Sequence, residues 1–488
     1  MVEVGGLHTR ALSRTSAGPD RLARWQAGLL WCLALLTVAF GVVTFVRGAA
    51  EHHRHTDAGV YFRAAWAMRA GADPYTVTDD NGWHYIYPPA LAVVIAPLAD
   101  PPKGQTRERG LPYPASIALW YALNVAALGL ALHWLASALE ATSTNPRLAS
   151  PRPFGWRWWS LRIAPLGVCV FQIGTTLGRG QVTPIVLLCL AGMMAAALRG
   201  RRGSAGAWLG AAIVLKLYPA YLLLYPLWRG SARMLTFCMA SAAVGLVILP
   251  VAALGPERAF DCYRSLYHYL VAPAVSGQSV GVDRPEYLDE AGGNIASFKV
   301  VLFRLFYPLS AHRPASIPPV FSLLHWALGA LITAVTLLAV GRRRTTDPVD
   351  ELLFVGLLTT ALLPIIPVSR CHYFALSAPL VMAIVASVRE RHREATSYRW
   401  LALLALVSAL TIIHDWPGLG FLADFQLTAY AEMLLWAAGL VELRRRRGEL
   451  GQLAAKQGAL PSLVGEAPRA PLDVAVGALV DAPGLSGE

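Results

Sequence analysis

The chain has 488 residues, of which 55% are hydrophobic and 15% charged, and its formal net charge is +12. A soluble domain rarely carries so few charges, whereas a polytopic membrane protein normally does. The basic residues cluster at the ends of apolar runs, which is the positive-inside pattern of membrane topology and argues against a nucleic-acid partner.

The first apolar run, residues 25–46, follows a polar segment, residues 1–25, that contains four arginines. The run is longer than the apolar region of a cleaved signal peptide, so it predicts an uncleaved signal anchor. Because basic flanks stay on the cytoplasmic side, we expect the segment 1–25 in the cytoplasm. The next loop, residues 47–112, then faces outward.

This first outer loop contains a short apolar piece, residues 90–99, which follows two prolines. If the piece spanned the membrane, the basic run at 199–202 would fall outside, against the positive-inside rule. If it lies on the outer surface, every later basic cluster falls inside. We therefore expect residues 57–71 and 88–98 to form two juxtamembrane helices.

Later apolar runs alternate between the two sides when charge is the guide. The stretch between Arg202 and Arg229 is basic at both ends and carries Lys216 in its middle, followed by a proline. This predicts a hairpin of two short helices, since lysine is costly in lipid and proline removes a helical hydrogen bond. The expected fold is all-α, with about twelve transmembrane helices. The expected parts are a cytoplasmic segment (1–25), a transmembrane domain (26–443) with large outer loops at 47–112 and 255–318, and a disordered cytoplasmic tail (444–488).

This topology gathers acidic, basic and aromatic side chains from distant segments on the outer face. Attack of a hydroxyl on a sugar carbon needs a base, and a carboxylate can provide it. A departing lipid phosphate gathers negative charge, which Arg, Lys and His donors stabilise. A single essential carboxylate fits an inverting displacement. The candidates are Asp57 as the base, Lys216, His372, Arg370 and Arg179 for the donor phosphate, and Tyr61, Tyr87, Gln181 and Gln278 for the sugar or the acceptor.

Five sequence pieces occur in order along residues 25–390. They are D-x-x-V-Y-x-x-A with G-x-x-P-Y and Y-x-Y-P-P in the first outer loop, GRGQVTPIVLL, AGAWLGAAIVLKLYPAYLLLYPLWRG, SGQSV and LLPIIPVSRCHY. Together they resemble the polyprenyl-phosphate-mannose-dependent mannosyltransferases of glycosyltransferase family 87, which belong to the membrane C-type glycosyltransferase superfamily.

The resemblance implies an inverting enzyme whose acidic base lies in the first outer loop, where Asp57 matches. The family's lysine-proline hairpin falls on Lys216, and its GQ turn falls on Gln181. Two positions depart from the family pattern. The histidine after the prolines is often one of an adjacent pair, but Arg-Cys-His leaves only His372 here, and Gly-Gln-Ser replaces Asn-Gln-Ser, so only Gln278 carries over.

Each candidate also has a structural explanation. Asp57 stands at the expected start of a helix and fits a cap or a first-turn acid. Lys216 fits a side chain that snorkels to the membrane surface, and His372 fits an interfacial histidine. Outer-face arginines also pair with lipid headgroups, and glutamines in turns also satisfy backbone groups.

The sequence therefore predicts transfer of mannose, or a similar sugar, from a polyprenyl phosphate to a hydroxyl of a glycolipid or glycan acceptor. The enzyme is expected in the plasma (inner) membrane, among membrane lipids, with its active site on the extracytoplasmic side. We expect no metal and no cofactor beyond the lipid-linked sugar donor. The alternatives are a lipid-linked sugar transporter or flippase, which predicts broken helices in two mirrored halves, and an assembly protein on an inactive enzyme scaffold. Cys262 and Cys371 are both expected outside, where they could form a disulfide.

Overall fold

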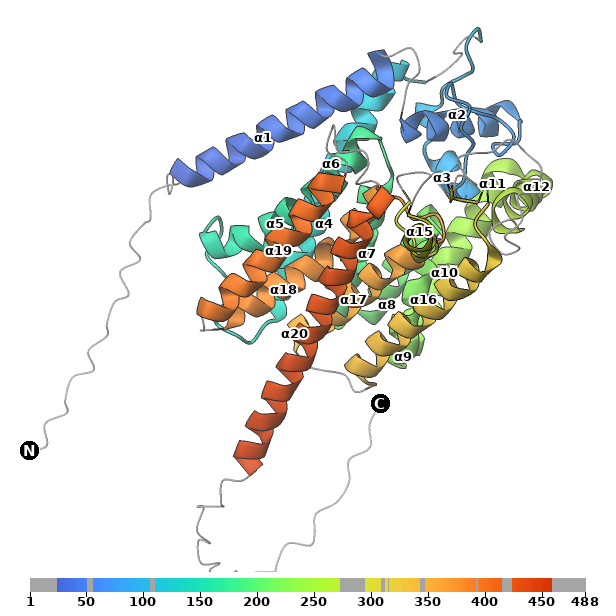
Figure 1. The fold of residues 1–488 in the computed structure, drawn as a ribbon. Helices are drawn as coiled ribbons and strands as arrows, with labels where there is room; N and C mark the ends of the chain where they lie inside the picture. The colour runs from blue at the N-terminus through green and yellow to red at the C-terminus, as the bar shows by residue number, and fades with distance from the viewer. Residues whose placement is uncertain are drawn as a thin grey trace, which may run out of the picture. The chain divides into compact units, whose positions relative to one another are not determined.

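The computed structural model describes residues 24–50, 56–105, 110–272, 295–308, 312–314, 316–342, 347–391, 394–414 and 424–458. Within these ranges the chain is all-α, with two isolated β-bridges and no strand. It divides into two units, Met1–Leu443 and Arg444–Glu488. Figure 1 shows the helices, which are α1 (Arg24–Phe45), η1 (Val46–Ala50), α2 (Asp57–Ala70), α3 (Pro89–Val94), η2 (Ala96–Leu98), α4 (Tyr113–Thr142), α5 (Trp156–Val168), α6 (Val170–Gly178), α7 (Thr183–Leu198), α8 (Arg202–Leu215), η3 (Tyr218–Leu223), α9 (Leu224–Trp228), α10 (Ala232–Ala243), η4 (Val244–Ile248), α11 (Leu249–Leu254), α12 (Pro256–Leu266), η5 (Tyr267–Val271), α15 (Phe298–Phe306), α16 (Pro319–Val340), α17 (Pro348–Ile365), η7 (Cys371–Ser377), α18 (Ala378–Glu390), α19 (Glu394–His414) and α20 (Leu427–Gly458).

Among the described residues, six helices are long and apolar enough to cross a membrane, or seven if the bent pair α5–α6 counts as one span. The two halves of that pair meet at 69°, and the break between them is at Cys169. The predicted count of about twelve crossings is not confirmed. Several predicted spans are short helices, such as α7 with 16 residues and α8 with 14, whereas a full crossing needs about 20.

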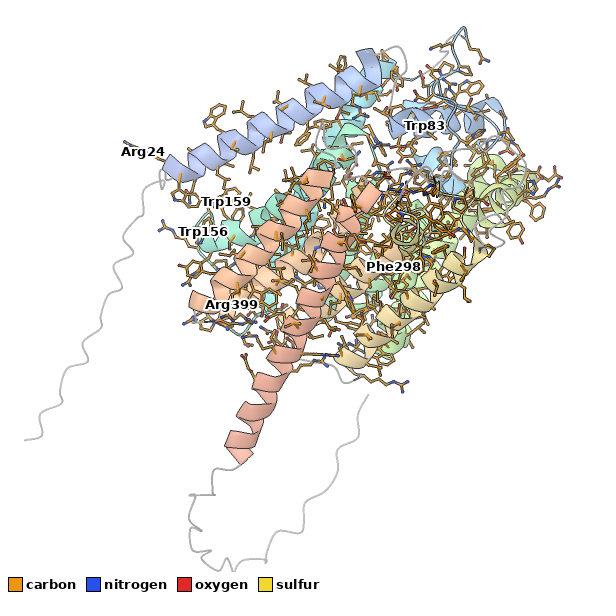
Figure 2. The ribbon with its side chains drawn as sticks, in the orientation of Figure 1. Arg24, Trp83, Trp156, Trp159, Phe298 and Arg399 are labelled. Carbon is orange, nitrogen blue, oxygen red and sulfur yellow. The ribbon has the colours of Figure 1, made fainter. Side chains whose placement is uncertain are left out.

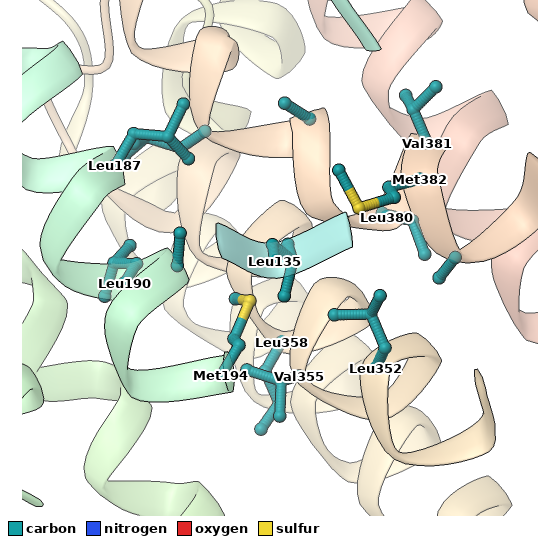
Figure 3. Close-up of a cluster of buried hydrophobic side chains, with 14 of the residues drawn as sticks. Leu135, Leu187, Leu190, Met194, Leu352, Val355, Leu358, Leu380, Val381 and Met382 are labelled. Carbon is teal, nitrogen blue, oxygen red and sulfur yellow. The ribbon is translucent and has the colours of Figure 1, made fainter. Parts of the chain in front are cut away.

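The centre of the first unit is formed by α17 and by η7 with α18. Their apolar windows are 94% and 89% buried within the protein, whereas that of α1 is 6% buried. Figure 3 shows how side chains from these two helices pack against α4 and α7. Because lipid is as apolar as leucine, such close packing is a main source of helix association in a membrane. The packed side chains include Leu135, Leu187, Leu190, Met194, Leu352, Val355, Leu358, Leu380, Val381 and Met382.

Tryptophans gather where α1 begins. Trp25 packs edge-on against Trp156 of α5, with ring centroids 6.1 Å apart, and Figure 2 shows Trp156 and Trp159 below this end of α1. Arg24 lies at the same end. Tryptophan next to arginine at a helix end is typical of the boundary between lipid and water.

The two helices predicted in the first outer loop are confirmed as α2 and as α3 followed by η2. Arg63 of α2 is buried and ties this loop together. Its guanidinium donates to Asp80 at 2.8 Å and to the backbone oxygens of Thr78 and Asp100 at 2.9 and 3.1 Å. A buried charge with this many partners is well compensated for its lost hydration. The position of α2, which begins at Asp57, is therefore fixed.

The predicted break in the hairpin is confirmed at Lys216. Helix α8 ends at Leu215, the Lys216 backbone is extended (φ −146°, ψ 138°), and η3 begins at Tyr218. Pro219 lies in the first turn of η3, where a missing N–H costs nothing. On the other side of α8, a Cβ at Gly206 would lie 2.1 Å from the Met234 oxygen. Only glycine allows this close approach of α8 to α10.

Residues 295 and 296, in the second half of the second predicted outer loop (255–318), are joined to the segment before η7. The Ala296 N–H donates to the Ser369 oxygen at 2.7 Å, and Ile295 forms an antiparallel bridge with Arg370. Ser297 then begins α15, because its hydroxyl accepts from the Val300 N–H. This part of the loop therefore lies beside the chain segment that carries Arg370 and His372.

The predicted boundary at residue 443 coincides with the division between the two units, but α20 continues across it to Gly458. Residues 444–458 are rich in Leu, Glu, Gln, Ala, Lys and Arg, all of which favour helix. Arg445 and Glu449 also form an ion pair one turn apart, at 3.2 Å, and such pairs stabilise a helix. The expectation of a disordered tail is therefore wrong for residues 444–458, and its remainder, 459–488, falls outside the described residues.

Candidate active site

The start of α2 is bonded to the turn between α6 and α7. The backbone N–H of Asp57 donates to the Arg179 oxygen at 2.8 Å, and the Trp120 indole donates to the Gly180 oxygen at 2.7 Å. Gly180 has φ +65°, and a Cβ there would lie 2.8 Å from the Ala58 Cβ. This glycine-containing turn therefore joins two motifs that are more than 100 residues apart in the sequence.

We expect Gly180→Ala to lower the thermal stability and to impair activity. A left-handed backbone costs a non-glycine residue about 1–2 kcal/mol, and the new methyl group must push away the N-terminal turn of α2. Gly200→Ala is the matched control, because Gly200 has φ +72° and a Cβ there would meet no heavy atom within 4 Å. The Gly200→Ala variant therefore has the energetic cost of the left-handed backbone without a steric clash. Equal losses of activity in the two variants would contradict the role assigned to the contact with Ala58.

Asp57 is the first residue of α2, and Thr56 occupies the N-cap position without a side-chain cap bond. The Asp57 Oδ2 atom is buried and has no hydrogen-bond partner within the described part of the chain. A carboxylate in the first turn is stabilised by the helix dipole, but Asp57 Oδ2 accepts no hydrogen bond from the backbone of α2. The structure thus leaves a carboxylate oxygen available for chemistry.

Gln181 is the centre of a buried hydrogen-bonded group. Its Oε1 atom lies 3.1 Å from the Tyr61 hydroxyl, 3.3 Å from the Tyr87 hydroxyl and 3.3 Å from the Lys216 ammonium. The two hydroxyls are 2.9 Å from each other. Burial raises the pKa of Tyr61 and of Tyr87 well above the usual range, so both phenols stay protonated. Of the residues predicted to contact the sugar or the acceptor, Gln181 therefore bonds directly to Lys216, and Tyr61 and Tyr87 bond to Gln181.

Lys216 does not snorkel to the surface, because only 3% of the residue is exposed. Its ammonium lies 4.2, 5.1 and 5.6 Å from the ring centroids of Tyr373, Tyr87 and Tyr218. It also lies 3.5 Å from the Thr183 hydroxyl. Burial lowers the pKa of Lys216 to about 7, and the charge of Asp57 partly opposes this shift. A cation in such surroundings gains much by binding an anion.

His372 is also buried, and its Nε2 atom has no hydrogen-bond partner within the described residues. The Thr176 hydroxyl of α6 donates to the His372 backbone oxygen at 2.9 Å, which fixes η7 beside α6. Arg370 precedes His372 by two residues, Arg179 directly follows α6, and the Lys216 ammonium lies over the ring of the residue that follows His372. Arg179 and Arg370 are themselves half-buried. The structure therefore brings the four predicted phosphate-binding residues into one neighbourhood.

Two tyrosines of this site are absent from the residues singled out in the sequence. Tyr218 and Tyr373 pack against each other at 5.5 Å and stand over Lys216. The signal was their position in the motifs, since Tyr218 follows Lys216 by two residues and Tyr373 follows His372 directly.

Other predictions have mixed outcomes. Gln278 lies outside the described residues. Cys262 and Cys371 are both thiols, so the disulfide considered between them is not formed, and burial raises the pKa of the Cys262 thiol to about 11. No three His, Cys, Asp or Glu side chains lie close enough to hold a metal ion among the residues described. The expected absence of a metal stays a prediction.

Comparison with known proteins identifies the family. A family model described as glycosyltransferase family 87 matches residues 85–364, more than half of the chain. The match includes Gln181 and Lys216, whereas Asp57 and His372 lie outside it. Comparison with curated proteins finds no match. The chain therefore belongs to glycosyltransferase family 87, as the motifs predict, and is a multi-pass membrane glycosyltransferase.

Proposed function

We propose that this glycosyltransferase moves mannose, or a similar sugar, from a polyprenyl phosphate to a hydroxyl of a glycolipid or glycan. The proposed reaction takes place on the outer face of the plasma (inner) membrane. The observation that carries the proposal is the meeting of one unpartnered carboxylate oxygen with buried cationic donors. Asp57 Oδ2 is buried without a partner among the described residues. One turn further along α2, the Tyr61 hydroxyl donates to the side-chain oxygen of Gln181, which also accepts from Lys216. Transfer from a glycosyl phosphate needs both a base and cations.

In the proposed reaction, the acceptor oxygen attacks the anomeric carbon from the side opposite the lipid phosphate. Asp57 takes the proton of the attacking hydroxyl while the new carbon–oxygen bond forms. The bond from the anomeric carbon to the phosphate oxygen breaks, and its electron pair leaves with the polyprenyl phosphate. Displacement from the opposite side inverts the anomeric configuration and requires one carboxylate.

The charge that develops on the departing phosphate is met by Lys216, His372, Arg370 and Arg179. Lys216 is the strongest candidate, because aromatic rings surround its ammonium. In such low-dielectric surroundings a charge pair is stronger than in water. Donors fixed in place before the reaction do not need to reorganise during it, and the bond from Lys216 to Gln181 supplies this positioning.

The sugar and the acceptor are assigned to residues beside the phosphate donors. Tyr61, Tyr87 and Gln181 already form one hydrogen-bonded group with Lys216. Their hydroxyl and amide groups suit sugar hydroxyls, and tyrosine rings suit sugar faces. Gln278 stays a predicted member of this set. The sugar that is transferred would then lie between this group and Asp57.

The donor assay tests the proposed function directly. Purified enzyme is incubated with a glycolipid extract and either labelled polyprenyl-phosphate mannose or labelled GDP-mannose. We expect label to enter a glycolipid from the lipid-linked donor alone, with inversion at the anomeric carbon. Transfer from GDP-mannose would contradict the donor assignment. Movement of the labelled lipid across a vesicle membrane without a new glycosidic bond would instead favour the transporter.

A further inference from the structure

A cavity of about 230 Å³ lies at the opposite end of α7 from the candidate active site. Helix α7 begins at Thr183, two residues after Gln181, and its last residues, Ala197 and Leu198, line the cavity. Sixteen residues of α-helix span about 24 Å at a rise of about 1.5 Å per residue. The cavity is therefore separate from the residues assigned to sugar transfer, and it is independent of the proposed function.

Two helices present their N-terminal ends at this cavity without a side-chain cap. Helix α8 begins at Arg202, and α10 begins at Ala232 after Ser231 in the N-cap position. Ser231 lines the cavity and is 5% exposed, yet its hydroxyl neither caps α10 nor has any other partner among the described residues. A buried hydroxyl without a partner is costly to the folded state. Together with the uncapped helix ends, this hydroxyl points to a ligand that accepts hydrogen bonds.

The charged side chains around the cavity sum to zero in formal charge, so the helix ends decide which ligand charge it favours. Arg202, Arg229, Asp347 and Glu351 line it. Glu351 is occupied by Arg229, which donates to its two oxygens at 3.1 and 2.7 Å. Asp347 accepts from two backbone N–H groups of the first turn of α17. Because both carboxylates already have donors, a cation finds little to bind. The helix ends add partial positive charge.

We propose that this cavity binds a phosphate group that carries a single negative charge. Its oxygens accept hydrogen bonds from the Ser231 hydroxyl and from the first backbone N–H groups of α10, as phosphates do at helix N-termini. The Arg202 guanidinium supplies a charged donor from the rim. The four charged side chains cancel one another in formal charge, so a monoanion is balanced better than a dianion. A lipid phosphodiester and inorganic phosphate share this chemistry.

Thermal unfolding of the full-length protein in dodecyl maltoside tests the proposal. Sodium phosphate is titrated against sodium chloride of equal ionic strength, and dihexanoyl-phosphatidylglycerol is titrated separately. We expect at least one of the two to raise Tm with a saturable midpoint. A response to phosphate identifies free phosphate as sufficient, and a response to the lipid alone identifies a headgroup as the source.

Variants distinguish this cavity from the rest of the surface. Ser231→Ala and Arg202→Gln are each expected to weaken the binding of whichever ligand raises Tm by about tenfold, because each variant loses one hydrogen bond to the phosphate. Ser231→Ala should keep the Tm without ligand unchanged or higher, because it removes an unpartnered hydroxyl. Arg233→Gln is the matched control, since Arg233 lies in the same turn of α10 but stands over Phe237 at 6.0 Å. No saturable shift with either probe, or equal midpoints in all variants, overturns the proposal.

Discussion

Asp57→Asn is expected to reduce turnover by about 10²- to 10⁴-fold, the range that a positioned general base contributes. Asparagine has nearly the shape of aspartate but cannot take the proton of an attacking hydroxyl. The fold should survive, because Asp57 is bonded to Arg179 through its backbone N–H and not through its carboxylate. The measurement is transfer of labelled sugar from the lipid-linked donor in membranes with equal amounts of each variant.

Asp261→Asn serves as the control for loss of one acidic group outside the membrane spans. Asp261 is exposed on α12, so its replacement should leave turnover near that of the wild type. Thermal unfolding of the Asp57→Asn protein shows whether α2 keeps its place. Wild-type turnover by a well-folded Asp57→Asn variant would end the assignment of Asp57 as the base.

Lys216→Met is expected to lower kcat/KM for the donor by about 10²- to 10³-fold, the effect of removing one donor that stabilises transition-state charge. Methionine fills a similar volume between the tyrosine rings but brings no charge. The Gln181 oxygen keeps its contacts with the Tyr61 and Tyr87 hydroxyls, so no buried acceptor is left without a donor. The fold should therefore persist while donor use fails, which steady-state kinetics with varied donor concentration measures.

The pH dependence shows whether Lys216 acts through its positive charge. Its pKa is lowered to about 7 by burial, so the ammonium is present below that pH and is lost above it. We expect kcat/KM, which reports the free enzyme, to fall as the pH rises through about 7. Lys216→Arg stays charged in this range and should abolish this fall. A rise in kcat/KM through the same pH range would instead make neutral Lys216 the base.

The sequence by itself determined the class of this protein and several of its local features. Hydropathy and the placement of arginines identified a membrane protein. The helices at 57–71 and 88–98 and the break at Lys216 were also predicted correctly. These features depend on neighbouring residues, since a proline removes a helical hydrogen bond and a lysine is costly in lipid. The order of the motifs likewise identified the family, which the match over residues 85–364 confirms.

Only the tertiary structure decided which of these pieces meet. Asp57 contacts Arg179, and Tyr61 contacts Gln181, across more than 100 residues of chain. Gln181 in turn contacts Lys216, which lies more than 30 residues further on. The number of helices long enough to span the membrane was likewise not predicted, because the protein uses short and bent helices. Burial decided the rest. The sequence allowed Lys216 to reach the membrane surface, but in the structure its side chain is buried among tyrosine rings. Such contacts depend on the packing of α2, α7 and η7 together, and no local pattern of residues encodes that packing.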